Sequence, residues 1–254
     1  MDNIKVIAYK AVDVLTLGRG ISRNFHGARI RFPPRWSRYF AGDYEPETFQ
    51  FLRENLKPGD TFLDIGAHIG LFSVVASRLV GKKGRVISFE PTPYTRGVMR
   101  DVLRLNGVTD GVEVRSEAVS SESGTTTFFD SGETISVVNS LVRHKDARAE
   151  FEVTVVTLDE FAAEHGVKPD CMKIDVEGSE LELLFGAKKT LTEDRPKIIL
   201  SIHPPFVPNG RTTVEGIWSK LEEHCYNIFF EGQPVEREWF CSKPELFDVV
   251  LLPA

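Results

Sequence analysis

The sequence predicts an α/β fold of the Rossmann-like type, with a mostly parallel sheet and helices on both of its faces. From residue 60 onward, short apolar segments alternate with amphipathic ones, and strands that alternate with helices of about 10 to 15 residues form βαβ units. A glycine-rich turn, 66–70, follows the first strand, and acidic residues stand at strand ends at Asp64, Glu90 and Asp175. In open α/β sheets, ligands bind outside the carboxyl ends of the strands, so these residues predict a ligand site there.

The elements follow from the apolar pattern and from turn residues. Helices are expected at 46–56, 71–80, 94–107, 157–166, 179–194 and 212–225. Strands are expected at 61–66, 85–91, 112–119, 171–178, 197–205, 226–232 and 245–254. The short gap between the last two strands favours an antiparallel edge.

Two regions depart from this alternation. Residues 120–157 contain two segments rich in Thr, Val and Phe, 124–130 and 151–158, which suit extended structure. The residues between them indicate an irregular or hairpin insertion. Residues 1–45 begin with a helical pattern at 4–17 and continue into a basic, aromatic segment. We therefore expect an α/β domain at 46–254 with an insertion at about 120–157, preceded by an N-terminal extension at 1–45.

Composition limits the classes of protein. The chain has 254 residues, 41% of them apolar and 27% charged, and its net charge is −6. An acidic balance argues against a broad nucleic-acid footprint, so no nucleic-acid partner is expected. The three cysteines form no CxxC pair that would indicate structural zinc. There is no apolar run of about 20 residues, as a transmembrane helix requires, and no signal-peptide pattern, so we expect a cytoplasmic protein.

The turn after the first expected strand, Asp64 to Gly70, indicates a nucleoside site. Gly66 allows a tight turn and close approach of a ligand, and Gly70 allows the helix to pack closely on the strand. Glu90 lies at the end of the next strand, where a carboxylate accepts both ribose hydroxyls. His68, inside the turn, is expected to contact the cofactor locally.

This turn favours S-adenosylmethionine over a dinucleotide. It lacks the GxGxxG pattern, and the Asp64 carboxylate would repel a pyrophosphate and attract a cation. An NAD-dependent oxidoreductase on the same fold is the alternative enzyme, and a cofactor-binding module without catalytic activity is the alternative from another class.

The candidate catalytic residues follow two later strands. Asp175 and Glu177 lie in the segment KIDVEGSE, and His203 directly follows the apolar strand before two prolines. Histidine acts as a general base near neutral pH, so we expect His203 to be the base, oriented or assisted by Asp175. Oxygen and imidazole ligands also suit Mg²⁺ or Mn²⁺, so a metal held by Asp175, Glu177 and His203 is an alternative.

With FLDIGAHIG, ISFEPTP and MKIDVEGSE in view, the chain resembles the FkbM family of S-adenosylmethionine-dependent class I methyltransferases. The resemblance implies a seven-stranded sheet of order 3-2-1-4-5-7-6 with strand 7 antiparallel, and mostly O-methylation of sugars or natural products. It also implies which residues contact the cofactor. The methionine part would be contacted by Asp64, Gly66, Ala67 and Gly70. Glu90 would hold the ribose, and the adenine would be contacted by Ser116, Glu117 and Ala118.

The segments outside the βαβ units are expected to bind the methyl acceptor. We expect a small-molecule or sugar-containing acceptor, contacted by the N-terminal segment and the insertion. The candidates are Arg35, Trp36, Tyr39, Asn139 and Ser140. Arginines suit an acidic or phosphate-bearing substrate, and aromatic rings stack on a sugar face. Equally, the N-terminal segment could pack on the core or on a second copy in a homodimer.

Overall fold

Eight strands form the central sheet of the computed structural model, which describes residues 15–16, 18–36, 39–40, 42–130, 140–143, 148–207 and 211–254. The spatial order is β12-β11-β13-β10-β9-β3-β4-β5. The strands are β3 (Thr61–Ile65), β4 (Arg85–Phe89), β5 (Val112–Arg115), β9 (Cys171–Ile174), β10 (Lys197–Ile202), β11 (Tyr226–Phe230), β12 (Gln233–Pro234) and β13 (Phe247–Pro253). Apart from the two-residue edge strand β12, this is the expected order 3-2-1-4-5-7-6.

The expected antiparallel edge is also confirmed. β13 inserts between β10 and β11 and runs antiparallel to both. The strands from β10 to β5 are parallel to one another. Ile65 at the end of β3 pairs with Ile174 at the end of β9, so the segments that follow these strands leave the sheet at one edge.

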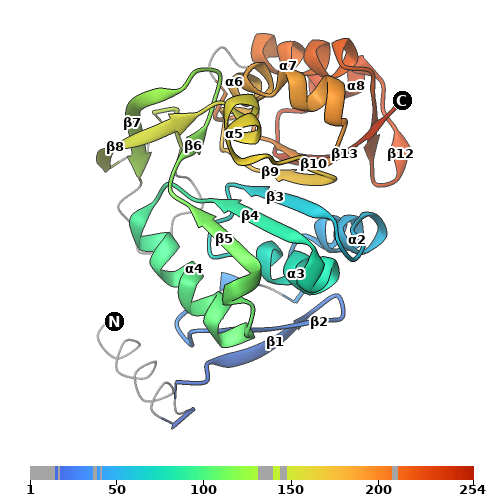
Figure 1. The fold of residues 1–254 in the computed structure, drawn as a ribbon. Coiled ribbons are helices and arrows are strands. Elements are labelled where there is room, and N and C mark those ends of the chain that lie inside the picture. Colours follow the sequence, from blue (N-terminus) through green and yellow to red (C-terminus); the bar gives the residue numbers. More distant parts are fainter. Residues whose placement is uncertain are drawn as a thin grey trace.

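Helices cover both faces of the sheet (Figure 1). On one face lie α2 (Pro46–Asn55), α3 (Leu71–Val80) and α4 (Pro93–Asn106), and on the other lie α5 (Leu158–His165), α6 (Glu180–Gly186), α7 (Arg211–Glu223) and α8 (Arg237–Ser242). Successive strand residues point to opposite faces, so Phe62 joins the core under α2–α4 while Leu63 joins the core under α5–α8. Both faces are therefore apolar, as in buried parallel sheets.

A hairpin that the sequence analysis did not anticipate precedes α2. β1 (Ile21–Phe25) and β2 (Ala28–Phe32) pair antiparallel and lie beneath α4 (Figure 1). Phe25, Ile30 and Phe32 are fully buried in the same core as α2–α4. The Asn106 side chain at the end of α4 accepts from the Arg31 amide at 3.0 Å and donates to the Arg31 carbonyl at 2.8 Å, which ties the hairpin to that helix.

The expected insertion forms a separate three-stranded sheet of order β6-β8-β7. Its strands are β6 (Ala118–Val119), β7 (Gly124–Asp130) and β8 (Ala149–Val156). β7 and β8 are the two segments expected to be extended, and they pair antiparallel. Most of the residues between them, where an irregular or hairpin segment was expected, lie outside the described residues. The strand expected at 112–119 is divided, because β5 belongs to the central sheet whereas β6 pairs with β8.

Some local expectations differ from the structure. The helix expected at 179–194 ends as α6 at Gly186, and a π-helical turn follows at Thr190–Asp194. α8 was not expected, and most of the helical pattern at 4–17 lies outside the described residues. Of the helices in the described ranges, none has both the length and the apolar character that a membrane span requires.

Candidate active site

A cavity of about 420 Å³ opens at the carboxyl edge of the central sheet. One part of its wall comes from the segments after β3, β4 and β5, which contribute Gly66, His68, Glu90, Pro91, Thr95, Glu117 and Ala118. The other part comes from the segment before α2 and from β10, β13 and the residues around them, which contribute Tyr44, Glu45, Asp175, Glu177, Ser179, Ser201, His203, Phe206, Leu246 and Asp248. The cavity thus joins the expected cofactor residues to the expected catalytic ones.

Gly66 connects the two parts directly. Its φ is +82°, and a Cβ there would lie 1.8 Å from the Asp175 carbonyl oxygen. The amides of Gly66 and Ala67 both donate to the Phe89 carbonyl, at 3.0 and 2.9 Å. Only glycine fits this position, which has a left-handed backbone and a close backbone neighbour. The turn after β3 is therefore held against the ends of both β4 and β9.

Glu90 is buried at the end of β4 and faces the cavity. Its Oε2 accepts from the His68 amide at 3.0 Å, and its Oε1 accepts from the Thr92 amide at 2.8 Å. Burial raises the pKa of Glu90 to about 7, against the opposing effect of the Thr92 and His68 hydrogen bonds. The carboxylate is thus oriented by two backbone amides and by the Thr92 side chain.

Several predicted cofactor residues lie beside the cavity rather than in its wall. Asp64 is buried, accepts from the Ser73 hydroxyl at 2.5 Å, and does not border the cavity. Burial raises the pKa of Asp64, although Lys173 opposes the shift. Ala67, Gly70 and Ser116 also lie outside the cavity wall. Gly70 was expected to allow packing on the strand, but the side chain against it is Met99 of α4.

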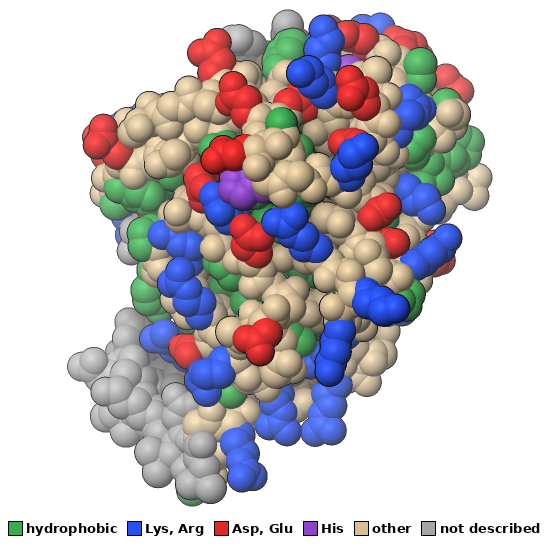
Figure 2. Space-filling view, viewed as in Figure 1, with side chains coloured by type: hydrophobic (Ala, Val, Ile, Leu, Met, Phe, Trp, Pro, Cys, Tyr) green, Lys and Arg blue, Asp and Glu red, His purple; other side chains and the backbone are tan. Residues whose placement is uncertain are grey.

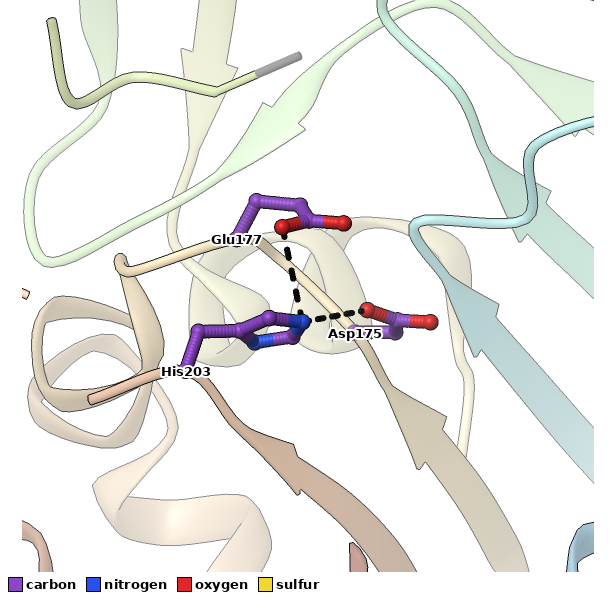
Figure 3. Close-up of side chains that lie close together, drawn as sticks. All are labelled: Asp175, Glu177 and His203. Carbon is purple, nitrogen blue, oxygen red and sulfur yellow. Dashed lines mark ion pairs between the residues drawn. The ribbon is translucent and has the colours of Figure 1, made fainter. Parts of the chain in front are cut away.

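Asp175, Glu177 and His203 converge at the centre of the site (Figure 3). Asp175 follows β9, and His203 follows β10, the adjacent strand. His203 Nε2 lies 3.4 Å from Asp175 Oδ1 and 3.4 Å from Glu177 Oε2. One potential ligand atom from each of the three residues lies within 4.8 Å of the other two. The predicted catalytic pair and the predicted metal ligands are therefore one cluster.

The shortest contact of His203 is to a residue that the sequence analysis did not assign. Nδ1 lies 2.7 Å from Oε1 of Glu180, which is fully buried at the start of α6. The same Oε1 accepts from the Gly178 amide at 3.0 Å. A carboxylate on Nδ1 fixes the orientation of the ring and directs Nε2 toward the cavity. Glu180 is thus the residue that positions His203, whereas Asp175 lies at its other nitrogen.

Lys173 supplies positive charge behind the cluster. Its Nζ donates to Asp175 Oδ2 at 2.6 Å and lies 5.3 Å from the centre of the Phe72 ring. Burial alone would lower the pKa of Lys173, but the surrounding carboxylates, above all Asp175, raise it. Burial alone would raise the pKa of Asp175, but Lys173 and His203 hold it below its usual range. Asp175 is therefore ionised at neutral pH.

The pKa values of His203 and Glu177 are raised, whereas that of Asp175 is lowered. Burial alone would lower the pKa of His203, but its bond to Glu180 and the charges of Asp175 and Glu177 raise it to about 9. Burial raises the pKa of Glu177 to about 8, and His203 opposes that shift. Without a bound cation, His203 therefore carries a proton at neutral pH.

The predicted acceptor residues that the structure describes lie outside the cavity wall. The two segments expected to supply them do reach the wall, through Tyr44 and Glu45 of the extension and through Phe128 and Leu141 of the insertion. Trp36 is 1% exposed and packs near Tyr39 and His68. Arg35 is exposed and lies over Tyr94, with its Cζ 5.7 Å from the ring centre. Ser140 is buried and donates to the Glu177 carbonyl at 2.6 Å. Asn139 lies outside the described residues.

Sequence reasoning missed the wall opposite the expected cofactor residues. Tyr44, Glu45, Ser201 and Asp248 all border the cavity. Ser201 and Asp248 face each other on the antiparallel pair β10 and β13, and a polar pair inside two otherwise apolar strands was a usable signal. Nothing in the local sequence places Tyr44 and Glu45 near Asp175, because they come from before α2.

The geometry and the motifs agree with the comparisons with known proteins. The FkbM methyltransferase domain matches residues 64–228. The chain belongs to the FkbM methyltransferase family. Its sequence is 30% identical over 211 residues to the 31-O-demethyl-FK506 methyltransferase FkbM of Streptomyces tacrolimicus, an alignment that covers 71% of this chain and 77% of that protein. It is 29% identical to the hexuronic acid methyltransferase AglP of Haloferax volcanii, over 66% of each chain.

Solved structures share the fold of this FkbM-family chain. The crystal structure of the methyltransferase FkbM from Methylobacillus flagellatus KT superposes with a TM-score of 0.50 at 17% identity, over 84% of this chain and 56% of that one. The ribosomal protein L11 methylase of Lactobacillus delbrueckii subsp. bulgaricus gives a TM-score of 0.50 at 13% identity, over 88% of this chain and 84% of that one. At these identities the similarity concerns the fold, which is the one that the sequence predicts.

Proposed function

We propose that this methyltransferase transfers the methyl group of S-adenosylmethionine to a hydroxyl of a sugar or another natural product. The observation that carries the proposal is the shared cavity, which is lined both by Glu90 and the Gly66 turn and by the Asp175–Glu177–His203 cluster. When bound, S-adenosylmethionine supplies a methyl group that is already activated. The protein therefore has to align the acceptor and remove its proton.

The cavity wall suits this cofactor. Among the lining residues that the structure describes there is no Lys or Arg, so no basic side chain of the wall favours a pyrophosphate. The Glu90 carboxylate, held by two backbone amides, is suited to the ribose hydroxyls, and carboxylates around the cavity favour a positively charged sulfonium. These features and the family membership both argue against the NAD-dependent alternative.

In the proposed mechanism, His203 Nε2 accepts the hydroxyl proton of the acceptor, and Glu180 orients the ring through Nδ1. Because the pKa of His203 is about 9, the imidazole must first release its own proton. A positive charge that arrives beside Asp175 and Glu177 competes with the imidazolium for these carboxylates and promotes that release. Asp175, ionised and held by Lys173, then stabilises the charge that forms when the ring accepts the acceptor's proton.

The test begins with the cofactor. We expect S-adenosylhomocysteine to bind the wild-type chain at micromolar strength in isothermal calorimetry, which corresponds to about −8 kcal/mol. His203→Ala should bind it equally well and lose about 10²- to 10⁴-fold in methyl transfer from tritiated S-adenosylmethionine to the acceptor. Wild-type turnover in His203→Ala would exclude the proposed base. Absence of binding by the folded wild-type chain would refute the cofactor assignment.

A divalent cation is the second candidate for activation of the hydroxyl, because one atom each of Asp175, Glu177 and His203 converges within 4.8 Å. The contact of Nδ1 with Glu180 also fits, because a histidine that binds a metal through one ring nitrogen commonly donates from the other to a carboxylate. Such an ion would lower the pKa of a coordinated hydroxyl. We expect Mn²⁺ to bind the wild-type chain in calorimetry and not Asp175→Asn, while Glu160→Gln, an exposed substitution on α5, leaves binding unchanged. Equal binding by all three proteins would remove the metal from consideration.

A further inference from the structure

The wall of the cavity on the side of β10 and β13 carries a concentration of acidic groups that the proposed chemistry does not use. Glu45 comes from the segment before α2, and Asp248 comes from β13. Their neighbours in the wall are Ser201, Phe206 and Leu246. Because Glu90 and the Gly66 turn are assigned to the cofactor, we assign the space along this wall to the methyl acceptor.

We infer, on the basis of the proposed function, that Glu45 and Asp248 form an acceptor subsite that selects hydroxyl-rich molecules without a negative charge, such as neutral sugars, over uronates. Carboxylates accept hydrogen bonds from sugar hydroxyls and repel another carboxylate. The subsite is thus a specificity element within the proposed active site.

Asp248 borders the cavity from β13. The Ser201 side chain hydrogen-bonds to the Asp248 carboxylate and holds it in the cavity wall. An acceptor hydroxyl can donate to this carboxylate from the cavity, whereas the carboxylate of a uronate would be repelled by it.

Glu45 is held in place at the start of α2. It adopts φ 39° at the N-cap of α2, and its Oε2 accepts from the Thr48 hydroxyl at 3.1 Å. Burial raises the pKa of Glu45 to about 7; Lys173 opposes this shift, while Asp175 and Asp248 add to it. The negative charges already interact with one another, so a further anion in this space would add to their repulsion.

The remaining side chains of the subsite fit the apolar face of a sugar. The Phe206 ring stacks on His203 at a centroid distance of 6.1 Å, and Leu246 is 54% exposed at the cavity wall. Lys173 lies behind this wall, where it opposes the rise of the Glu45 pKa, and it does not border the cavity. Figure 2 shows Lys and Arg gathered on the visible face over α3, α4 and the β1–β2 hairpin. The arginine-rich N-terminal segment therefore provides no positive charge among the described residues of the cavity wall.

The test uses matched pairs of ligands and does not require knowledge of the natural acceptor. Saturation-transfer NMR is recorded on the full chain loaded with S-adenosylhomocysteine, with methyl glucoside against glucuronate and methyl galactoside against galacturonate. We expect the neutral member of at least one pair to bind about tenfold more tightly or better than its uronate. Asp248→Asn and Glu45→Gln should each reduce that ratio severalfold, while the exposed substitutions Glu245→Gln and Glu47→Gln leave it unchanged.

Equal or tighter binding of the uronates would overturn the inference, and so would the absence of binding by every neutral sugar. If neither Asp248→Asn nor Glu45→Gln changes the ratio of neutral-sugar to uronate binding, the selectivity belongs to other residues, and the inference is overturned as well. If S-adenosylhomocysteine fails to bind, the proposed function fails. The same ligand pairs are then compared on the protein alone, so the charge preference is judged separately.

Discussion

At the residue scale, the assignment of His203 depends on which of its two nitrogens each carboxylate contacts. Glu180 lies 2.7 Å from Nδ1, whereas Asp175 and Glu177 both lie 3.4 Å from Nε2. A histidine held in this way presents Nε2 to the cavity in one orientation. Spacing in the sequence predicted that Asp175 and His203 meet, but it did not predict that Glu180 positions the ring.

Glu90 gives a prediction on pH. Burial raises the pKa of Glu90 to about 7, above its usual value, so the group is mostly protonated at pH 6 and mostly ionised at pH 8. The ionised form accepts ribose hydroxyls, and its fraction changes about tenfold over this range. We expect the affinity for S-adenosylhomocysteine, measured by calorimetry, to rise severalfold from pH 6 to pH 8.

Two variants separate this effect from other titrating groups. In Glu90→Gln the affinity should be weaker and nearly independent of pH, because no carboxylate remains to ionise. Glu164→Gln, an exposed substitution on α5 away from the cavity, should keep the wild-type profile. A pH-dependent profile that persists unchanged in Glu90→Gln would assign the titration to another residue.

At the element scale, the turn between β3 and α3 is the most constrained connection of the site. Gly66 has a left-handed backbone and lies against the Asp175 carbonyl, so any side chain there separates the β3 turn from the end of β9. Gly66→Ala should lower the free energy of unfolding by more than about 1 kcal/mol and weaken binding of S-adenosylhomocysteine.

Gly97 is the matched control for that substitution. It lies exposed within α4, and a Cβ there would meet nothing within 4 Å. Gly97→Ala should raise the free energy of unfolding by about 0.5 to 1 kcal/mol, since alanine favours a helix interior. Urea denaturation measures both, and an unaffected Gly66→Ala would mean that the turn can shift away from β9.

At the scale of the whole molecule, the β1–β2 hairpin belongs to the same core as the sheet. Phe32 is fully buried, makes an edge contact with Phe25 at 5.7 Å and stacks with Phe40 at 5.5 Å between ring centres. Phe32→Ala should lower the free energy of unfolding by about 3 to 5 kcal/mol, measured by urea denaturation. Phe185→Ala, at a position 52% exposed, should change it by less than about 1 kcal/mol.

The number of unfolding transitions also tests whether the hairpin belongs to this core. Because the hairpin shares a core with α2–α4, fluorescence and circular dichroism should report one coincident transition for the wild-type chain. An early separate transition, with Phe32→Ala affecting only that phase, would show that residues 21–40 form an independent unit.

The local pattern of the sequence by itself determined the alternation of strands and helices, and the family motifs determined the strand order and the cluster at the carboxyl edge. These follow from apolar periodicity and from the rule that parallel strands end at one edge. The glycine turn, Glu90, Asp175 and His203 were predictable because each directly follows a strand. The hairpin was not predicted, because its basic, aromatic segment carries no clear alternation.

Only the tertiary structure decided which side chains complete the cavity. Glu45 and Asp248 are 203 positions apart in the chain, and both border one cavity because α2 and β13 meet the same sheet edge. Trp36 and Ser140 were candidates for acceptor binding by sequence. Trp36 is instead buried in the core, and Ser140 is buried with its hydroxyl bonded to the Glu177 carbonyl. Proximity between distant segments depends on packing of the whole chain, and no local spacing encodes it.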